Sequence, residues 1–246
     1  MEFSDLVTIT QGSLPIMNPV SPKKVIAVGK AAGLCPSDSV IECGCGNGTL
    51  LALWSGEFGI SGTGIEVRSE ACLQARKAIR ERGFENRISI QCGDAATFVP
   101  ESPADCAVCL GASFIWGGFA QALQALQRMV HEKGKVVIGD RYWRNDRIPP
   151  EFAREWPDVC TEYEQLRYAR EAGFDCAYLV RASEDDWDRY ETGIWQACVQ
   201  WIEKNPGHHD RKEVLDYLHH IQDEYAGYGR EHVGWAMYLL TPAIEV

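Results

Sequence analysis

The chain has 246 residues, a formal net charge of −11, and 46% hydrophobic residues. This length predicts one α/β domain with an inserted cap, and the composition is sufficient for a sizeable core. No run of lysine and arginine exceeds two residues. This argues against a nucleic-acid backbone or an anionic membrane surface as a partner, because both attract clustered positive charge.

The N-terminal residues carry neither a basic region nor an apolar stretch of signal length, and no apolar run approaches 18 residues. We therefore expect neither a secretory signal nor a membrane-spanning segment. Ten cysteines are spread mostly through expected strands and helices. This distribution is typical of reduced thiols and indicates a cytoplasmic protein.

Residues 1–35 are expected to form an N-terminal arm that ends in a helix. The first 20 residues show little pattern, but Ser21 and Pro22 are a typical helix start, as N-cap and first helical residue. The helix ends near Gly33. Two roles remain open for it: it covers a ligand, or it only packs on the sheet.

The first strand of the expected core, residues 36–140, leads into a glycine-rich loop. Apolar residues from Val40 are followed by Gly44, Gly46 and Gly48, and a helix is expected from Thr49. Strand, glycine loop and helix together place a nucleotide at the carboxyl edge of a parallel sheet. Glycine leaves no Cβ between the backbone and such a ligand.

The loop spacing distinguishes between nucleotide ligands. It is G-x-G-x-G, whereas dinucleotide-binding loops have G-x-G-x-x-G, and the Gly-Lys-Ser/Thr end of a Walker loop is missing. Glu42 directly before the loop disfavours a pyrophosphate and suits a ligand with a cationic amino-acid group. The structural alternative is a tight turn that binds nothing.

A second acid follows the next strand, residues 62–67. Glu66 lies 24 residues after Glu42, and an acid about 20 residues beyond a glycine loop accepts hydrogen bonds from ribose hydroxyls. The alternative is a solvated charge at a strand end. A helix is expected from Ser69, its N-cap, to about Arg82.

Three more strands complete the core: residues 87–92, 104–110 and 135–140. Asp94, after the first of these, either contacts a ligand or caps a helix over 95–99. Cys106 and Cys109 have metal-type spacing, but residues three apart in a strand point to opposite faces, which favours a structural role. An amphipathic helix from Phe119 precedes the last of the three strands.

Beyond the core, an irregular substrate-side loop is expected over 141–160, because long loops at the carboxyl edge of a sheet are usually functional. A helix over 162–172 and a strand over 174–180 follow. A helical insertion over 183–230 starts at a capping-box-like Ser183, and the last strand lies within 231–246. The aromatic stripes of the insertion, which include Trp187 and Tyr190, favour packing in the core over binding of a ligand.

Two histidine doublets raise the question of a metal. Adjacent helical residues point about 100° apart, so a doublet does not converge on one ion. His208 and His209 adjoin a turn and are expected to be exposed. We predict no metal site.

The segment Glu42–Gly48 resembles motif I of class I S-adenosylmethionine (SAM) methyltransferases, E/D-x-G-x-G-x-G. Asp94 matches the family's acid for the adenine amino group, and the next N–H, of Ala95, meets a ring nitrogen. Further stretches are similar to a bacterial subgroup that acts on small molecules, and they extend the resemblance over nearly the whole chain: Met17–Pro19, Gly111–Phe119, Tyr142–Arg144, Asp186–Glu191 and Gly234–Trp235.

The resemblance implies a single methyltransferase domain over 1–246. Its α/β fold is Rossmann-like, a mostly parallel seven-stranded sheet of order 3-2-1-4-5-7-6 with helices on both faces and a helical insertion before the last strand. SAM is the expected cofactor and S-adenosylhomocysteine (SAH) the product. The expected cofactor contacts are Glu42, Gly44, Cys45, Gly46, Gly48, Glu66, Asp94, Ala95, Leu110 and Gly111.

The expected activity is methyl transfer to a small molecule, with a homodimer left open. The expected acceptor pocket consists of Asn18, Ala112, Ser113, Trp116, Tyr142 and Trp143. Asp140 and Tyr142 are the candidates for a general base, while Trp116 and Trp143 have sealing the core as their alternative. The segment Leu110–Ser113 replaces the D/N-P-P-Y/F of base N-methyltransferases and disfavours that substrate. Two other functions stay open: a cofactor-binding protein without catalysis, and, less favoured, a nicotinamide-dependent oxidoreductase.

Overall fold

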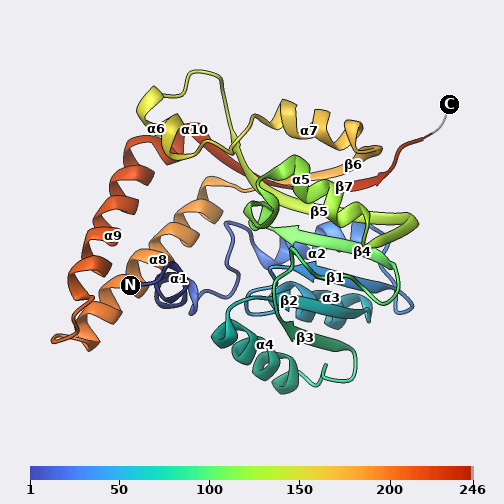
Figure 1. The fold of residues 1–246 in the computed structure, drawn as a ribbon, viewed down its shortest axis with the longest axis horizontal. Coiled ribbons are helices and arrows are strands. Elements are labelled where there is room, and N and C mark those ends of the chain that lie inside the picture. The colour runs from blue at the N-terminus through green and yellow to red at the C-terminus, as the bar shows by residue number, and fades with distance from the viewer. Residues whose placement is uncertain (245–246) are drawn as a thin grey trace.

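The computed structural model describes residues 1–244, and its centre is a seven-stranded sheet of order β3-β2-β1-β4-β5-β7-β6 (Figure 1). This confirms the predicted order. Strands β1 to β5 run parallel, and β7 is antiparallel to both β5 and β6. The strands are β1 (Ser39–Cys43), β2 (Ser61–Glu66), β3 (Ile88–Cys92), β4 (Ala104–Leu110), β5 (Val130–Trp143), β6 (Phe174–Arg181) and β7 (Val233–Pro242).

Helices cover both faces of the sheet. The α-helices are α1 (Phe3–Gln11), α2 (Pro22–Ala31), α3 (Thr49–Phe58), α4 (Ser69–Glu81), α5 (Phe119–Gln127), α6 (Pro150–Glu155), α7 (Glu162–Glu171), α8 (Glu184–Lys204), α9 (Arg211–Glu224) and α10 (Arg230–His232). One core cluster joins α2, α3 and α4 to the sheet, and another joins α5 and α7 to it. Among residues 1–244, none of the helices has the length and apolar composition of a membrane-crossing segment.

The helical insertion has a small core of its own. Apolar residues of α8 and α9, among them Ile194, Cys198 and Leu218, pack together and on Leu14 of the N-terminal arm. Helix α1 lies beside α8, so the N-terminal arm and the insertion before β7 together form one helical cap (Figure 1). The cap is thus anchored to the arm as well as to the sheet.

Three local expectations were wrong. Strand β5 covers residues 130–143, longer than the predicted 135–140. At its start Val130 pairs with Ala104 of β4, and at its far end β7 pairs with it as far as Trp143 and Val233. No helix forms over 95–99, where Asp94 accepts a hydrogen bond from the backbone N–H of Ala96 in a turn. The N-cap of α4 is Arg68 rather than Ser69. Of the predicted last-strand segment, residues 245–246 lie outside the described residues.

The insertion begins at a capping box, as predicted. The Ser183 side chain accepts from the N–H of Asp186, and the Asp186 carboxylate accepts from the N–H of Ser183. That carboxylate is 3% exposed and is also paired with the ammonium group of Lys24 on α2. Burial opposes its charged form, but the hydrogen bonds from Lys24 and Ser183 outweigh burial and lower the pKa of Asp186 to about 2.

We expect Asp186→Asn to lower the free energy of unfolding by about 2 kcal/mol at pH 7, because a pKa lowered by nearly two units stabilises the charged fold by that amount. The folded-state pKa lies below the unfolded one. The stabilisation is therefore present above about pH 4 and lost as the pH falls toward 2. Urea unfolding between pH 2 and 7 measures it, with the exposed neighbour Asp185→Asn as control. Equal stability of the two variants at pH 7 would refute the assignment.

Candidate active site

The glycine loop joins β1 to α3 at the carboxyl edge of the sheet. Gly44, Gly46 and Gly48 all have positive φ, between 54° and 72°, where side chains are strained. The N–H groups of Gly44 and Cys45 donate to the carbonyl of Ile65 on β2, at 2.8 and 3.0 Å. A Cβ on Gly44 would lie 2.8 Å from the Ala112 Cβ. The loop is therefore held closely between β2 and the segment after β4.

Glu66, at the end of β2, faces this loop. Its side chain is only 4% exposed and accepts from the N–H of Gly46 at 2.9 Å. It also accepts from the backbone N–H and the guanidinium Nε of Arg68, both at 2.9 Å. The alternative of a solvated strand-end charge is thus wrong. The structure instead shows an acid that links the loop to β2.

Glu42, at the end of β1, is also 4% exposed, but its Oε2 atom has no hydrogen-bond partner. Burial, and next the charge of Glu66, raise the pKa of Glu42 well above its usual range. A buried carboxyl oxygen without a partner is costly unless a ligand satisfies it. This oxygen and the glycine loop therefore fit a ligand that brings a cationic group to the sheet edge.

One cavity of about 940 Å³ runs from the glycine loop to the helical insertion. Its volume is at the upper end of the range for small-molecule sites. Many of the predicted site residues line it: Asn18, Glu42, Gly44, Cys45, Gly46, Glu66, Asp94, Ala95, Leu110, Gly111, Ala112 and Asp140. The Asn18 amide donates to the carbonyl of Leu110 at 3.2 Å, so the arm closes over the end of β4.

The other predicted residues do not line this cavity: Gly48, Ser113, Trp116, Tyr142 and Trp143. Trp143 instead packs edge-on against Phe152 and beside Trp156. Trp116 packs on the second core cluster. The reason is that β5 continues through 142 and 143, so these residues pack against β7 and α6 rather than project from a loop. This placement agrees with the alternative in which both tryptophans seal the core.

Asp140 connects the ends of β4 and β5. Its carboxylate accepts from the Ser113 hydroxyl and from the Arg141 N–H. Burial raises the pKa of Asp140, although these hydrogen bonds oppose the shift. A basic carboxylate at the cavity wall is chemically suited to receiving a proton.

The cap contributes polar residues that the sequence interpretation did not select. Glu191 of α8 and Tyr217, His220 and Glu224 of α9 line the cavity beside Tyr190. Burial raises the pKa of Glu191 to about 8, and it raises that of Glu224 as well. The aromatic stripe of α8 was visible in the sequence. Which neighbouring acids face the cavity depends on how the cap is placed, and helical spacing alone does not determine that.

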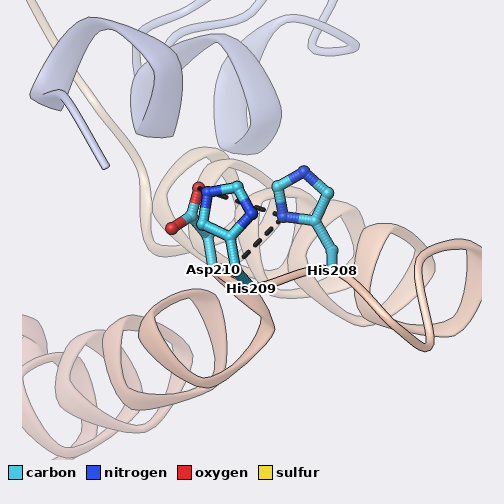
Figure 2. Close-up of side chains that lie close together, drawn as sticks. All are labelled: His208, His209 and Asp210. Carbon is cyan, nitrogen blue, oxygen red and sulfur yellow. Dashed lines mark hydrogen bonds and ion pairs between the residues drawn. The ribbon is translucent and has the colours of Figure 1, made fainter.

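Figure 2 shows the histidine doublet at the turn between α8 and α9. The rings of His208 and His209 stack at 4.5 Å, and Asp210 lies 3.2 Å from the His209 Nε2. The backbone N–H of Asp210 donates to the His208 Nδ1 at 3.2 Å. That nitrogen's lone pair is therefore already occupied. These contacts are local to the turn between α8 and α9. The absence of a metal site stays a prediction.

Comparison with known proteins agrees with this geometry. Residues 40–134 match the family described as "Methyltransferase domain". A SAM-dependent methyltransferase of Geobacter sulfurreducens, solved with SAH, is 35% identical with a TM-score of 0.90, covering 97% of this chain and 98% of its own. A Thiobacillus denitrificans SAM-dependent methyltransferase, also solved with SAH, is 30% identical with a TM-score of 0.91, at 98% and 100% coverage.

The uncharacterized Escherichia coli protein YjhP is also similar, 31% identical over 98% of this chain and 99% of its own. The fold, the glycine loop and the buried acids Glu42 and Glu66 define a nucleotide-binding α/β enzyme of the Rossmann-like class. The chain belongs to the SAM-dependent methyltransferases, with SAM as its cofactor. SAM supplies a sulfonium-bound methyl group.

The glycine loop yields a matched pair of substitutions. Gly44→Ala should lower the free energy of unfolding by more than about 1 kcal/mol and sharply weaken SAH binding, because it adds a clash with Ala112 to the strain of positive φ. Gly83→Ala has the same strain, at φ 72°, but no atom within 4 Å of its Cβ. It should leave SAH affinity unchanged. Calorimetry showing equal SAH affinity for both variants would contradict this role of the loop.

Proposed function

We propose that this enzyme transfers the methyl group of SAM to a small molecule held between the carboxyl edge of the sheet and the helical cap. The observation that carries the proposal is the single cavity that connects the glycine loop with α8 and α9. SAM bound at the glycine loop would leave the part of the cavity beside α8 and α9 free for an acceptor. A cavity of about 940 Å³ has the size of a small-molecule site.

Three acids have separate roles toward SAM in this proposal. Glu42, with its unpartnered oxygen, receives the amino group of the methionine part. Glu66 receives the ribose hydroxyls, with Arg68 moving aside or sharing the carboxylate. Asp94, exposed at the cavity wall, receives the adenine amino group. Their order along the cavity wall follows the order of β1, β2 and β3, which agrees with an extended ligand lying across the three strand ends.

For the acceptor, Asp140 is a better candidate than Tyr142 for receiving a proton, because Asp140 lines the cavity and Tyr142 is buried against Gly234. The net charge of −11 supports an acceptor that is not a nucleic acid. A cytoplasmic location and the open question of a homodimer stay with the sequence-based expectations.

The second candidate function is a protein that binds SAM without catalysis. The two functions differ in one measurement: SAH formed from SAM over a broad panel of small acceptors. Sustained SAH formation with one acceptor supports the enzyme. SAH binding without any turnover across the panel favours the second function.

Glu66→Ala should weaken SAH binding by about ten- to hundredfold, because hydrogen bonds to a charged carboxylate contribute roughly 1.5–3 kcal/mol. Glu66→Gln, which keeps one acceptor oxygen for Gly46, should lose less. Titration calorimetry measures both, with the exposed first-turn acid Glu70→Ala on α4 as control. A dissociation constant for Glu66→Ala equal to that of the control would refute the assignment.

A further inference from the structure

The cap end of the cavity combines two acids with aromatic rings. Glu191 of α8 and Glu224 of α9 both line it. After burial, the charge of Glu224 is the largest cause that raises the pKa of Glu191. Glu191 has no hydrogen bond or ion pair among the described residues. Glu224 pairs with His220, at 3.5 Å, its side chain is 18% exposed, and a hydrogen bond from Trp156 is among the causes that lower its pKa. The Glu191 carboxyl is thus available to a ligand, and the Glu224 carboxyl lies beside it at the cavity wall.

Fewer positive than acidic side chains line this end of the cavity. Arg141 lines the same end, with its guanidinium 3.8 Å from the centre of the Trp156 ring. It forms no ion pair within 4 Å among residues 1–244. Two carboxyls, of Glu191 and Glu224, thus face the one guanidinium of Arg141 at this end, and the exposed carboxyl of Glu155 lies within 4.8 Å of the ligand atoms of Glu224 and His220. The charge balance favours a cation.

The aromatic walls of this end of the cavity also suit a cationic ligand. Tyr190, Tyr217 and Trp156 line the cavity around the two acids, and aromatic faces attract cations. Trp187, 6% exposed and lining the same cavity, has an indole N–H without a hydrogen-bond partner. A buried donor is usually satisfied. This orphan N–H is a separate indication that the cavity is built to hold a ligand.

We propose that the acceptor is a small amine, bound as its ammonium form between Glu191 and Glu224 and enclosed by Tyr190, Tyr217 and Trp156. This inference rests on the proposed methyl transfer and specifies its substrate class. It also assigns to Glu191, in place of Asp140, the role of receiving the proton of the bound ammonium, because Glu191 would lie beside that group.

The chemistry balances with these groups alone. An N–H proton of the ammonium passes to the Glu191 carboxylate, and the freed nitrogen lone pair attacks the methyl carbon of SAM. A C–N bond forms and the C–S bond breaks with its electron pair going to sulfur, which leaves SAH and a methylated ammonium. Burial raises the pKa of Glu191 to about 8, so its carboxylate is far more basic than an ordinary glutamate.

The test uses matched probes and protein saturated with SAH. The amines are 2-phenylethylamine, 2-cyclohexylethylamine and n-butylamine, each compared by calorimetry with the alcohol and the carboxylate of the same carbon frame. The variants are Glu191→Gln and Glu224→Gln, with Glu203→Gln, exposed on the same helix α8, as control. SAH binding is measured first for every protein. Failure to bind SAH would count against the proposed function itself.

At least one amine should bind tenfold or more tightly than its alcohol and its carboxylate. Each of the two cavity variants should weaken that amine at least tenfold, with SAH affinity within twofold of the unsubstituted protein. Affinity should rise from pH 6 to 8 as Glu191 ionises beside Glu224, Arg141, Tyr190 and Tyr217, and Glu191→Gln should remove this rise.

Several results would overturn the proposal while leaving SAM-dependent transfer intact. They are an alcohol or carboxylate that binds as tightly as its amine, no binding of any amine to the SAH complex, and amine affinity unchanged in both variants. The ligand atoms of Glu155, His220 and Glu224 lie within 4.8 Å of one another. Zn²⁺ binding that is lost in His220→Ala, without amine binding, would assign the acids to a metal instead.

Discussion

The hydrogen bond from the Gly46 N–H to the Glu66 carboxylate is the contact on which the site depends. It joins the loop after β1 to the end of β2, so the register of these two strands fixes the shape of the loop. Gly64, beside Glu42 in that register, leaves room for Cys45, whose Sγ would lie 2.7 Å from an added Cβ. The buried charge of Glu66 is tolerated because several N–H groups and Arg68 satisfy it. A loop held in this way presents its backbone to a ligand without reorganising.

The cavity has a consistent electrostatic character along its length. Glu42, with an unpartnered Oε2 atom, lies at the cofactor end, and Glu191 and Glu224 lie at the cap end, all with pKa values raised by burial. Buried carboxyls with raised pKa values cost stability, which is typical of sites where function requires them. Their common feature is that a cationic ligand would restore their charged form. A sulfonium cofactor and an ammonium acceptor would both meet this requirement.

The sequence predicted what depends on local spacing. Three glycines at alternate positions and an acid at the end of each of two strands predicted the loop and a nucleotide site, because parallel strands bring their carboxyl ends to one edge. SAM as the cofactor and the strand order came from the resemblance to the methyltransferase family, and the structure has that order. It did not predict the extension of β5, since residues 142 and 143 become strand only through pairing with β7, some 90 positions later. For the same reason the tryptophan at 143 was assigned to a loop. The cap acids were missed because helical spacing gives the apolar face of α8, whereas the position of the cap decides that Glu191 faces the cavity.

A crystal structure of this enzyme with SAH tests the shared cavity most directly. The adenosine should lie between Glu66 and Asp94, the amino group should reach Glu42, and the sulfur should point along the cavity toward the cap. The space beside Glu191 and Glu224 should remain open to an acceptor. SAH bound away from the glycine loop, or SAH that fills the cap end and leaves no room beside those acids, would contradict a single cavity serving both cofactor and acceptor.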